Sequence, residues 1–362
     1  MGVIRLILAL SVLASHAGVL FNLEFVGGQI AVQAFYIISG FYMSLILNEK
    51  YIGQNGNYKL FISNRFLRLY PIYWAVLGLS ILFCFLNGLL SSDANFFCID
   101  FYVKYYKSVS TMLVLLFSQL LIIGQDVLMF FGFNPNTMTM YYTSNYALEP
   151  ISMHRFLFIP QAWTLGIEIC FYLIAPFILR RNWKWILSLL LLSFGIKMYI
   201  HFGLNLTNDP WSYRFFPSEL MFFLIGYFCY KMANKIKTIN VPEYVNLSIF
   251  VFLVLFTLFY FKIPSFGYPL FLIELLYFIV FVFSLPFLFV YFKNKKWDTQ
   301  IGDLSYPVYI SHMLIILLYS ACGFQYSSQG PYIALWCIVF SILLNKFISN
   351  PIEKLRQSRL KS

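Results

Sequence analysis

Apolar residues fall in long runs along this chain instead of alternating with polar ones. A run of about 20 apolar residues is long enough to cross the hydrocarbon core of a bilayer as a helix. Eleven candidate stretches are present, at residues 4–23, 30–47, 69–90, 109–131, 162–179, 185–203, 214–230, 245–261, 269–292, 304–321 and 331–348. The pattern therefore predicts an all-α, polytopic membrane protein.

Short basic segments separate the apolar runs and indicate the topology. They lie at residues 50–68, 180–184, 231–237, 293–296 and 354–361. Lysine and arginine accumulate in cytoplasmic loops, so we expect all five segments on the cytoplasmic side. Six spans after Arg180 alternate properly with these segments. Between Arg68 and Arg180, however, lie three candidate spans. Two segments on the same side of the membrane must be joined by an even number of crossings, so one candidate cannot cross fully.

The stretch 109–131 is the weakest candidate because serine, threonine, glutamine and aspartate dilute it. We expect it to be re-entrant, interfacial or half-spanning, a form tolerated where polar backbone lines a cavity within the protein. About ten transmembrane helices plus this partial or re-entrant helix then place both termini in the cytoplasm and the polar loop 133–160 outside. The expected division is a transmembrane domain over residues 1–350 and a short basic cytoplasmic tail over residues 351–362.

The composition supports a membrane protein. Of the residues, 60% are hydrophobic and only 11% are charged, whereas soluble domains carry about 25% charged residues. The first apolar run, with Arg5 before it and Ser15 and Ala17 near its end, also fits a cleaved signal peptide. That interpretation needs a soluble chain to follow, which the composition disfavours. The net charge of +11 reflects the basic residues of the segments expected on the cytoplasmic side, so no nucleic-acid partner is expected.

The six cysteines show neither CxxC pairs nor a metal-like spacing with histidine. They are expected to be small buried apolar side chains. No phosphate-binding glycine loop or zinc signature is present. The sequence thus gives no support to a soluble cofactor fold or to a metal site.

Arg5 and His16 are eleven residues apart in the first apolar run, RLILALSVLASHAG. At 100° per residue they return to within about 20° of the same helix face, about 16 Å apart along the axis. With the N-terminus inside, Arg5 lies near the cytoplasmic surface and His16 near the middle of the bilayer. An ionisable side chain at that depth is costly and indicates a functional site, although a structural histidine bonded to a neighbouring helix fits as well.

Arg65 and Arg68 follow in the stretch FISNRFLRLYPIYW. Being three residues apart at a helix start, they face the same side and could grip a phosphate with forked donors. Pro71 is expected to kink or start the next span. The same arginines fit a positive-inside anchor, so the residues alone leave both interpretations open.

These motifs, in this order, resemble the acyltransferase 3 family of integral-membrane O-acyltransferases, which modify bacterial surface glycans and some other acceptors. An arginine, ten residues and a histidine come first, then GGQIAVQAFYIISGF at 27–41, then RFLR ahead of PIYW. The similarity continues through WTLGIEICFY (163–172), YRFFPSELMFFLIGY (213–227), IGDLSYPVYISH (301–312) and NPIEK (350–354). The ordered set spans nearly the whole chain.

The resemblance implies roles for particular residues. It gives His16 as the catalytic residue and Arg5 as essential on the same helix. It gives Arg65 and Arg68 as the groups that bind the acyl-CoA donor, with acetyl-CoA expected and no metal. Glu168 matches the family acid, which partners His16 or Arg5 or else forms a buried ion pair between helices.

Asp303 and His312 are weaker candidates from the same resemblance. Asp303 also fits a helix cap, and His312 a buried side chain with a satisfied hydrogen bond. His154 and His201 are expected to be loop or interface histidines.

The function implied is transfer of an acyl group, with acetyl favoured, from cytoplasmic acyl-CoA to a hydroxyl of a cell-surface or lipid-linked saccharide such as O-antigen, capsule or exopolysaccharide. The expected location is the bacterial inner membrane, in contact with membrane lipids, without a fused esterase-like domain. A neutral imidazole could act as general base or carry the acyl group covalently. Two other classes stay open: a transporter or flippase of a lipid-linked glycan, and a noncatalytic membrane sensor.

Overall fold

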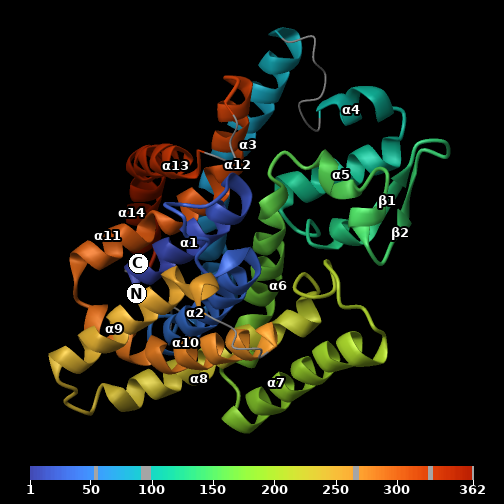
Figure 1. Ribbon diagram of the computed structural model, residues 1–362. Helices are drawn as coiled ribbons and strands as arrows, with labels where there is room; N and C mark the ends of the chain where they lie inside the picture. The colour runs from blue at the N-terminus through green and yellow to red at the C-terminus, as the bar shows by residue number, and fades with distance from the viewer. Residues whose placement is uncertain (53–55, 91–98, 264–268, 325–328, 361–362) are drawn as a thin grey trace. The chain divides into compact units, whose positions relative to one another are not determined.

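The structure, a computed structural model, describes residues 1–52, 56–90, 99–263, 269–324 and 329–360 and is mostly helical (Figure 1). Cys98 lies outside the described residues. The helices are α1 (Gly2–Ala17), α2 (Gly27–Glu49), α3 (Tyr58–Leu90), α4 (Ile99–Tyr105), α5 (Val109–Leu121), α6 (Trp163–Ile178), α7 (Trp183–Met198), α8 (Phe216–Ile236), α9 (Glu243–Leu258), α10 (Leu270–Phe292), α11 (Lys296–Asp303), α12 (Ser305–Ala321), α13 (Gly330–Leu344) and α14 (Asn350–Ser358). The strands are β1 (Phe131–Asn134) and β2 (Thr139–Tyr142).

Seven helical segments of the described chain are long and apolar enough to cross a membrane. They are Gly27–Glu49, Tyr58–Gly88, Pro160–Ile178, Trp183–Gly203, Leu270–Phe292, Lys296–Ala321 and Gly330–Ser358. Three further apolar helices, α1, α5 and α9, have between 10 and 17 residues. The prediction of an all-α membrane protein is confirmed, apart from one short β-hairpin.

The chain forms two compact units. Unit 1 comprises residues 1–68, 176–186 and 222–362, and unit 2 comprises residues 69–175 and 187–221. Most of α3 lies in unit 2, whereas its first turns, with Arg65 and Arg68, lie in unit 1. The candidate residues are therefore divided between units, with all but Glu168 in unit 1.

Helix α1 lies at the centre of unit 1, where it packs against α2, α11, α12 and α13 (Figure 1). Its N-terminal end meets α11 closely, since a Cβ on Gly2 would lie 1.6 Å from the Asp298 carbonyl oxygen. Asp298 also accepts hydrogen bonds from the backbone nitrogens of Gly2 at 2.7 Å and Val3 at 3.1 Å. Such a carboxylate satisfies amides that a helix leaves without partners in its first turn.

Helices α2 and α8 cross at a pair of glycines within unit 1. A Cβ on Gly40 would lie 1.9 Å from the carbonyl oxygen of Phe223, and one on Gly226 would lie 2.2 Å from that of Ile37. The backbones can approach only because both positions lack a side chain. This contact explains the glycines of the SGF and LIGY motifs.

Helix α3 is continuous over 33 residues and contains Pro71 in its interior. Pro71 therefore does not start the span, because the helix begins at Tyr58. A helical glycine of α3, Gly78, has open space where a Cβ would be added.

The weak stretch 109–131 forms only a 13-residue helix, α5, which ends where Ile122 adopts a left-handed conformation. A helix of that length covers about 20 Å, less than the hydrocarbon thickness. Aromatic residues of α3 satisfy its last carbonyls: Tyr73 donates to Gln119 at 2.6 Å, Trp74 donates to Leu120 at 2.9 Å, and Tyr70 donates to Leu121. The aromatic residues around Pro71 thus cap a partial helix.

The polar loop 133–160 contains structure that the sequence analysis did not predict. Strands β1 and β2 pair antiparallel, with Phe131 opposite Tyr142 and Asn134 opposite Thr139. The Asn134 side chain accepts the backbone N–H of Asn136 at 2.9 Å and so closes the turn. An Asn-Pro-Asn turn between aromatic residues is a hairpin signal of moderate strength.

Gly40→Ala should lower the thermal unfolding midpoint of the detergent-purified protein. The added methyl group would meet the backbone of α8, which cannot rotate away, and overpacking of this kind costs roughly 1–3 kcal/mol. Gly78→Ala is the matched control, because it adds the same group to an open helical position and should leave the midpoint unchanged or raised. Equal midpoints for the two variants would contradict the close crossing of α2 and α8.

Candidate functional site: a histidine pair and a group of arginines

Arg5 and His16 both project from α1, which holds them about 16 Å apart along its axis. His16 lies in the last turn, because α1 ends at Ala17 and the chain then reverses. Gly27, at the start of α2, has a φ of 74°, a conformation that favours glycine and ends this reversal. His16 is exposed at the protein surface.

His312 of α12 lies against His16. The two imidazole rings are stacked, with centroids 5.2 Å apart and planes inclined by 24°. His312 is fully buried, with 0% of its surface exposed. The structure thus brings the histidine of RLILALSVLASHAG into contact with the histidine of IGDLSYPVYISH.

The hydrogen bond of His312 identifies the ring nitrogen that donates. Its Nδ1 lies 2.6 Å from the carbonyl oxygen of Tyr309. Because a carbonyl only accepts, Nδ1 carries the proton and donates it. The Nε2 atom is buried without a hydrogen-bond partner among the described residues. The ring of His312 is thus held by its Nδ1–H in one orientation beside His16.

Arg5 and Arg68 come from different helices to one end of the site. Both charges act on Tyr42 of α2 and on Asp303, at the C-terminal end of α11. The four side chains are therefore close enough to interact, and Asp303 supplies a negative charge that acts on both arginines. Asp303 also ends α11 immediately before α12, the helix that carries His312.

Arg65 lies one helical turn before Arg68 and is buried, with 6% of its surface exposed. Its guanidinium carbon lies 5.9 Å from the ring centroid of Phe61. The predicted pair of arginines thus shares one end of unit 1 with Arg5.

Glu168 belongs to unit 2, where it accepts a hydrogen bond from the hydroxyl of Tyr172 one turn later on α6. The role of this carboxylate as a partner of His16 or Arg5 stays a prediction. Among the residues that the structure describes, no three histidine, cysteine or acidic side chains are grouped as metal ligands.

Residues 1–345 match the family model described as an acyltransferase domain. The chain belongs to the acyltransferase 3 family. A protein from Aquifex aeolicus (strain VF5), described as uncharacterized, is 28% identical over 204 residues, which cover 55% of this chain and 89% of the relative. No solved structure matches the chain.

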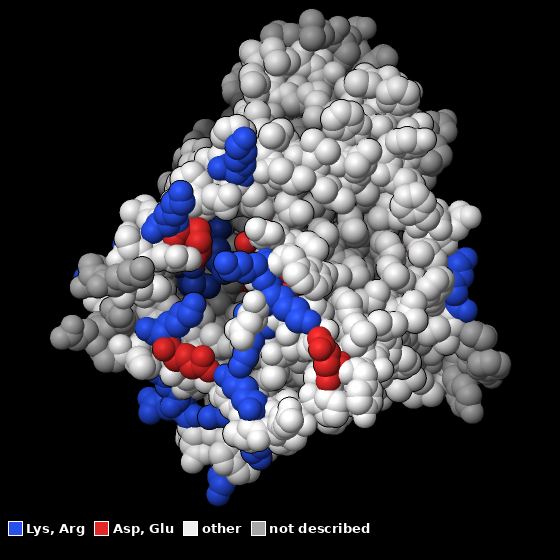
Figure 2. Space-filling view, turned by 90° about the vertical axis from the view of Figure 1, so that its left-hand side faces the viewer, with Lys and Arg blue, Asp and Glu red and all other residues white. Residues whose placement is uncertain are grey.

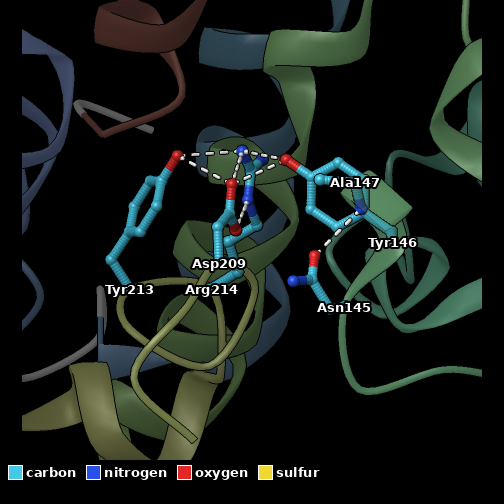
Figure 3. A network of polar contacts seen from close by, with 6 residues as sticks. All are labelled: Asn145, Tyr146, Ala147, Asp209, Tyr213 and Arg214. Carbon is cyan, nitrogen blue, oxygen red and sulfur yellow. Dashed lines mark hydrogen bonds and ion pairs between the residues drawn. The ribbon is translucent and has the colours of Figure 1, made fainter. Parts of the chain in front are cut away.

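In unit 2 of this acyltransferase, Arg214 occupies the centre of a polar network (Figure 3). Its guanidinium donates to both carboxylate oxygens of Asp209, at 2.5 and 2.7 Å, and to the hydroxyl of Tyr213 at 2.9 Å. Tyr146 donates to Asp209 at 2.6 Å. The guanidinium carbon also lies 4.2 Å from the ring centroid of Trp163.

This network joins three segments that are distant in sequence. Trp163 begins the WTLGIEICFY motif, Arg214 lies in the YRFFPSELMFFLIGY motif, and Tyr146 belongs to the polar loop. The sequence analysis singled out neither Arg214 nor Asp209. A buried arginine needs a paired carboxylate. An arginine in an apolar motif, with an aspartate five residues earlier, could therefore have indicated this ion pair from the sequence.

His154 borders the network, with its ring edge-on to Tyr146 at a centroid distance of 4.9 Å. Its Nδ1 lies 2.9 Å from the hydroxyl of Ser152. Burial, and then the charges of Arg214 and Arg155, lower the pKa of His154 from 6.5 to about 4. Its imidazole is therefore neutral at physiological pH, as expected for a loop histidine with a structural role.

Unit 2 should lose stability as the pH falls from 6.5 towards 4. The folded state resists protonation of His154 over this interval while the unfolded chain takes up the proton, so stability present above pH 6.5 declines below it. The thermal unfolding midpoint of the wild type should therefore fall more steeply over this range than that of His154→Asn, which cannot titrate. Parallel declines would show that His154 is not the titrating group.

Proposed function

We propose that this membrane acyltransferase moves an acyl group, with acetyl favoured, from acyl-CoA to a hydroxyl of a cell-surface or lipid-linked saccharide. Arg65 and Arg68 bind the phosphates of the donor, and His16 performs the transfer with His312 beside it. The donor and the acceptor class come from the family resemblance. The arrangement of unit 1 supports them.

The observation that carries the proposal is the spacing of charge and imidazole along α1. Arg5 and the arginines of α3 gather at one end, and the histidine pair lies about 16 Å further along the helix. Acyl-CoA has the same arrangement of parts, with phosphates at one end, a long pantetheine arm and a thioester at the other. An extended arm can bridge this interval and bring the thioester to His16.

His16 can act in two ways. As a general base it removes the proton of the saccharide hydroxyl while that oxygen attacks the thioester carbonyl, and CoA thiolate leaves. As a nucleophile it takes the acyl group from CoA and then passes it to the hydroxyl. Both routes need a neutral imidazole, and the stacked ring of His312 favours one because two imidazolium charges at 5.2 Å would repel.

The proposed topology has about ten crossings in the bacterial inner membrane with both termini in the cytoplasm. Helices α1, α8 and α9 join the seven longer segments as full crossings, and α5 is the partial helix. The arginines of α3 then face the compartment that contains acyl-CoA. The polar loop with the Arg214 network faces the opposite side, where surface saccharides are presented.

His16→Ala should lower acyl transfer by about 10²- to 10⁴-fold, the usual contribution of a general acid–base group. The measurement is transfer of radiolabelled acetyl from acetyl-CoA to the glycan fraction of membranes that contain the protein. His201→Ala is the control, because this exposed histidine belongs to the π-helical turn Tyr199–Gly203 of unit 2 and no role in transfer is assigned to it. A wild type that moved lipid-linked glycan across liposomes without ever acylating it would make the protein a flippase, and a phenotype unaffected by His16→Ala would make it a sensor.

Replacement of Arg65 and Arg68 by glutamine should raise the KM for acyl-CoA by about tenfold or more, because charge-assisted hydrogen bonds contribute about 1.5–3 kcal/mol each. Lys59→Gln removes a charge from an exposed position of the same helix and should leave the KM unchanged. An unchanged KM in the arginine variants would reduce both residues to topology anchors.

A further inference from the structure

Helix α14 brings a second buried arginine, after Arg65, into unit 1. Its residues belong to the segment expected as a basic tail, and they follow the end of the family match at residue 345. Arg356 nevertheless has only 8% of its surface exposed, whereas Lys354 on the same helix is exposed. One basic residue of α14 is therefore built into the protein while its neighbour faces outward.

The end of α14 is held on the first turns of α3. Arg359 donates to the side-chain oxygen of Asn64 at 3.0 Å and to the hydroxyl of Ser63 at 2.8 Å. Asn64 in turn donates to the hydroxyl of Tyr51 at 3.0 Å. These acceptors directly precede Arg65, so α14 is fixed beside the arginines assigned to the donor.

The charges around Arg356 do not favour its burial. Its carboxylate partner is Glu353, one turn earlier on α14. The charges of Arg65 and Arg68 oppose that of Arg356, and their effect on it exceeds the favourable effect of Glu353. Burying like charges together is costly unless an anion joins them.

A donor atom of Arg356 is also left unused. Its Nε is buried and has no hydrogen-bond partner among the described residues. Buried donors are normally satisfied, so an orphaned guanidinium N–H indicates a group that a ligand completes. The Nε and terminal nitrogens of arginine form a fork that fits two oxygens of one phosphate.

Figure 2 shows lysine and arginine side chains gathered round a hollow on the side of the molecule where α11 and α14 lie in Figure 1. Acidic side chains lie among them, some of them at the hollow, and the basic side chains predominate on this face.

We propose that Arg356 is a third phosphate-binding residue of the donor site and binds a phosphate of acyl-CoA together with Arg65 and Arg68. This assignment rests on the proposed function, because the donor is taken to be acyl-CoA. The phosphate would add negative charge beside Arg356, whose carboxylate partner is Glu353. Helix α14 then belongs to the binding site instead of trailing from the membrane domain.

The test compares donors with and without phosphates, on purified protein in detergent. Arg356→Gln should raise the KM for acetyl-CoA by about tenfold or more, and Lys354→Gln, which removes the same charge from an exposed position of α14, should not. Turnover of acetyl-pantetheine, which carries no phosphate, should be alike in the wild type and in Arg356→Gln. Arg356→Lys, which keeps the charge without the fork, should fall between.

The outcomes are distinguishable. If the wild type transfers acetyl from acetyl-CoA and Arg356→Gln keeps the wild-type KM, Arg356 is not a donor ligand, although the proposed function stands. Loss of turnover with both donors would make Arg356 a structural residue and would also overturn the assignment. If Arg356→Gln changes only the dependence of activity on added phosphatidylglycerol, the phosphate that Arg356 binds belongs to a lipid headgroup and the assignment to the donor is wrong. A wild type with no acetyl-CoA-dependent transfer would refute the proposed function itself.

Discussion

The site in unit 1 depends on how the N-terminal end of α1 is held by Asp298. This buried carboxylate, with 3% of its surface exposed, accepts the amides of Gly2 and Val3 and lies 2.5 Å from the amino nitrogen of Met1. It fixes the axial position of a helix with only 16 residues. A slip of one turn would move every side chain of α1 by about 5.4 Å, enough to separate His16 from His312. The glycine contact between α1 and α11 excludes such a slip, because only Gly2 and Gly302 permit that approach.

A second constraint is the need to satisfy backbone groups wherever a helix ends within apolar surroundings. α5 meets it through the hydroxyls and the indole of α3, and Gln125 adds hydrogen bonds to Tyr73 at 2.9 Å and to the Ser118 carbonyl at 3.2 Å. The polar residues that weaken this stretch as a membrane span are therefore the ones that allow a partial helix. In unit 2 the same requirement is met around Arg214, whose charge is paired with Asp209 and covered by aromatic rings.

Local periodicity accounts for what the sequence could predict. The positions of Arg5 and His16 follow from a single helix, and so does the shared face of Arg65 and Arg68. The position of His312 does not, because its contact with His16 joins helices almost 300 residues apart in sequence. The polar network around Arg214 and the burial of Arg356 also depend on tertiary contacts and could not be predicted from local periodicity. The hairpin was overlooked because its strands have only four residues each, too short for an alternating pattern to stand out.

The two histidines differ in a way that assigns them different tasks. The Nδ1–H of His312 is committed to the carbonyl of Tyr309, and the ring is sealed from solvent, so it cannot meet a substrate without a rearrangement. His16 is exposed at the end of a rigidly held helix and stacks on that fixed ring. A ring held at a defined tilt restricts the rotation of its neighbour. This restriction reduces the entropy lost when His16 engages the saccharide hydroxyl or the thioester carbonyl. In the proposed mechanism His312 is a positioning residue, and His16 performs the transfer.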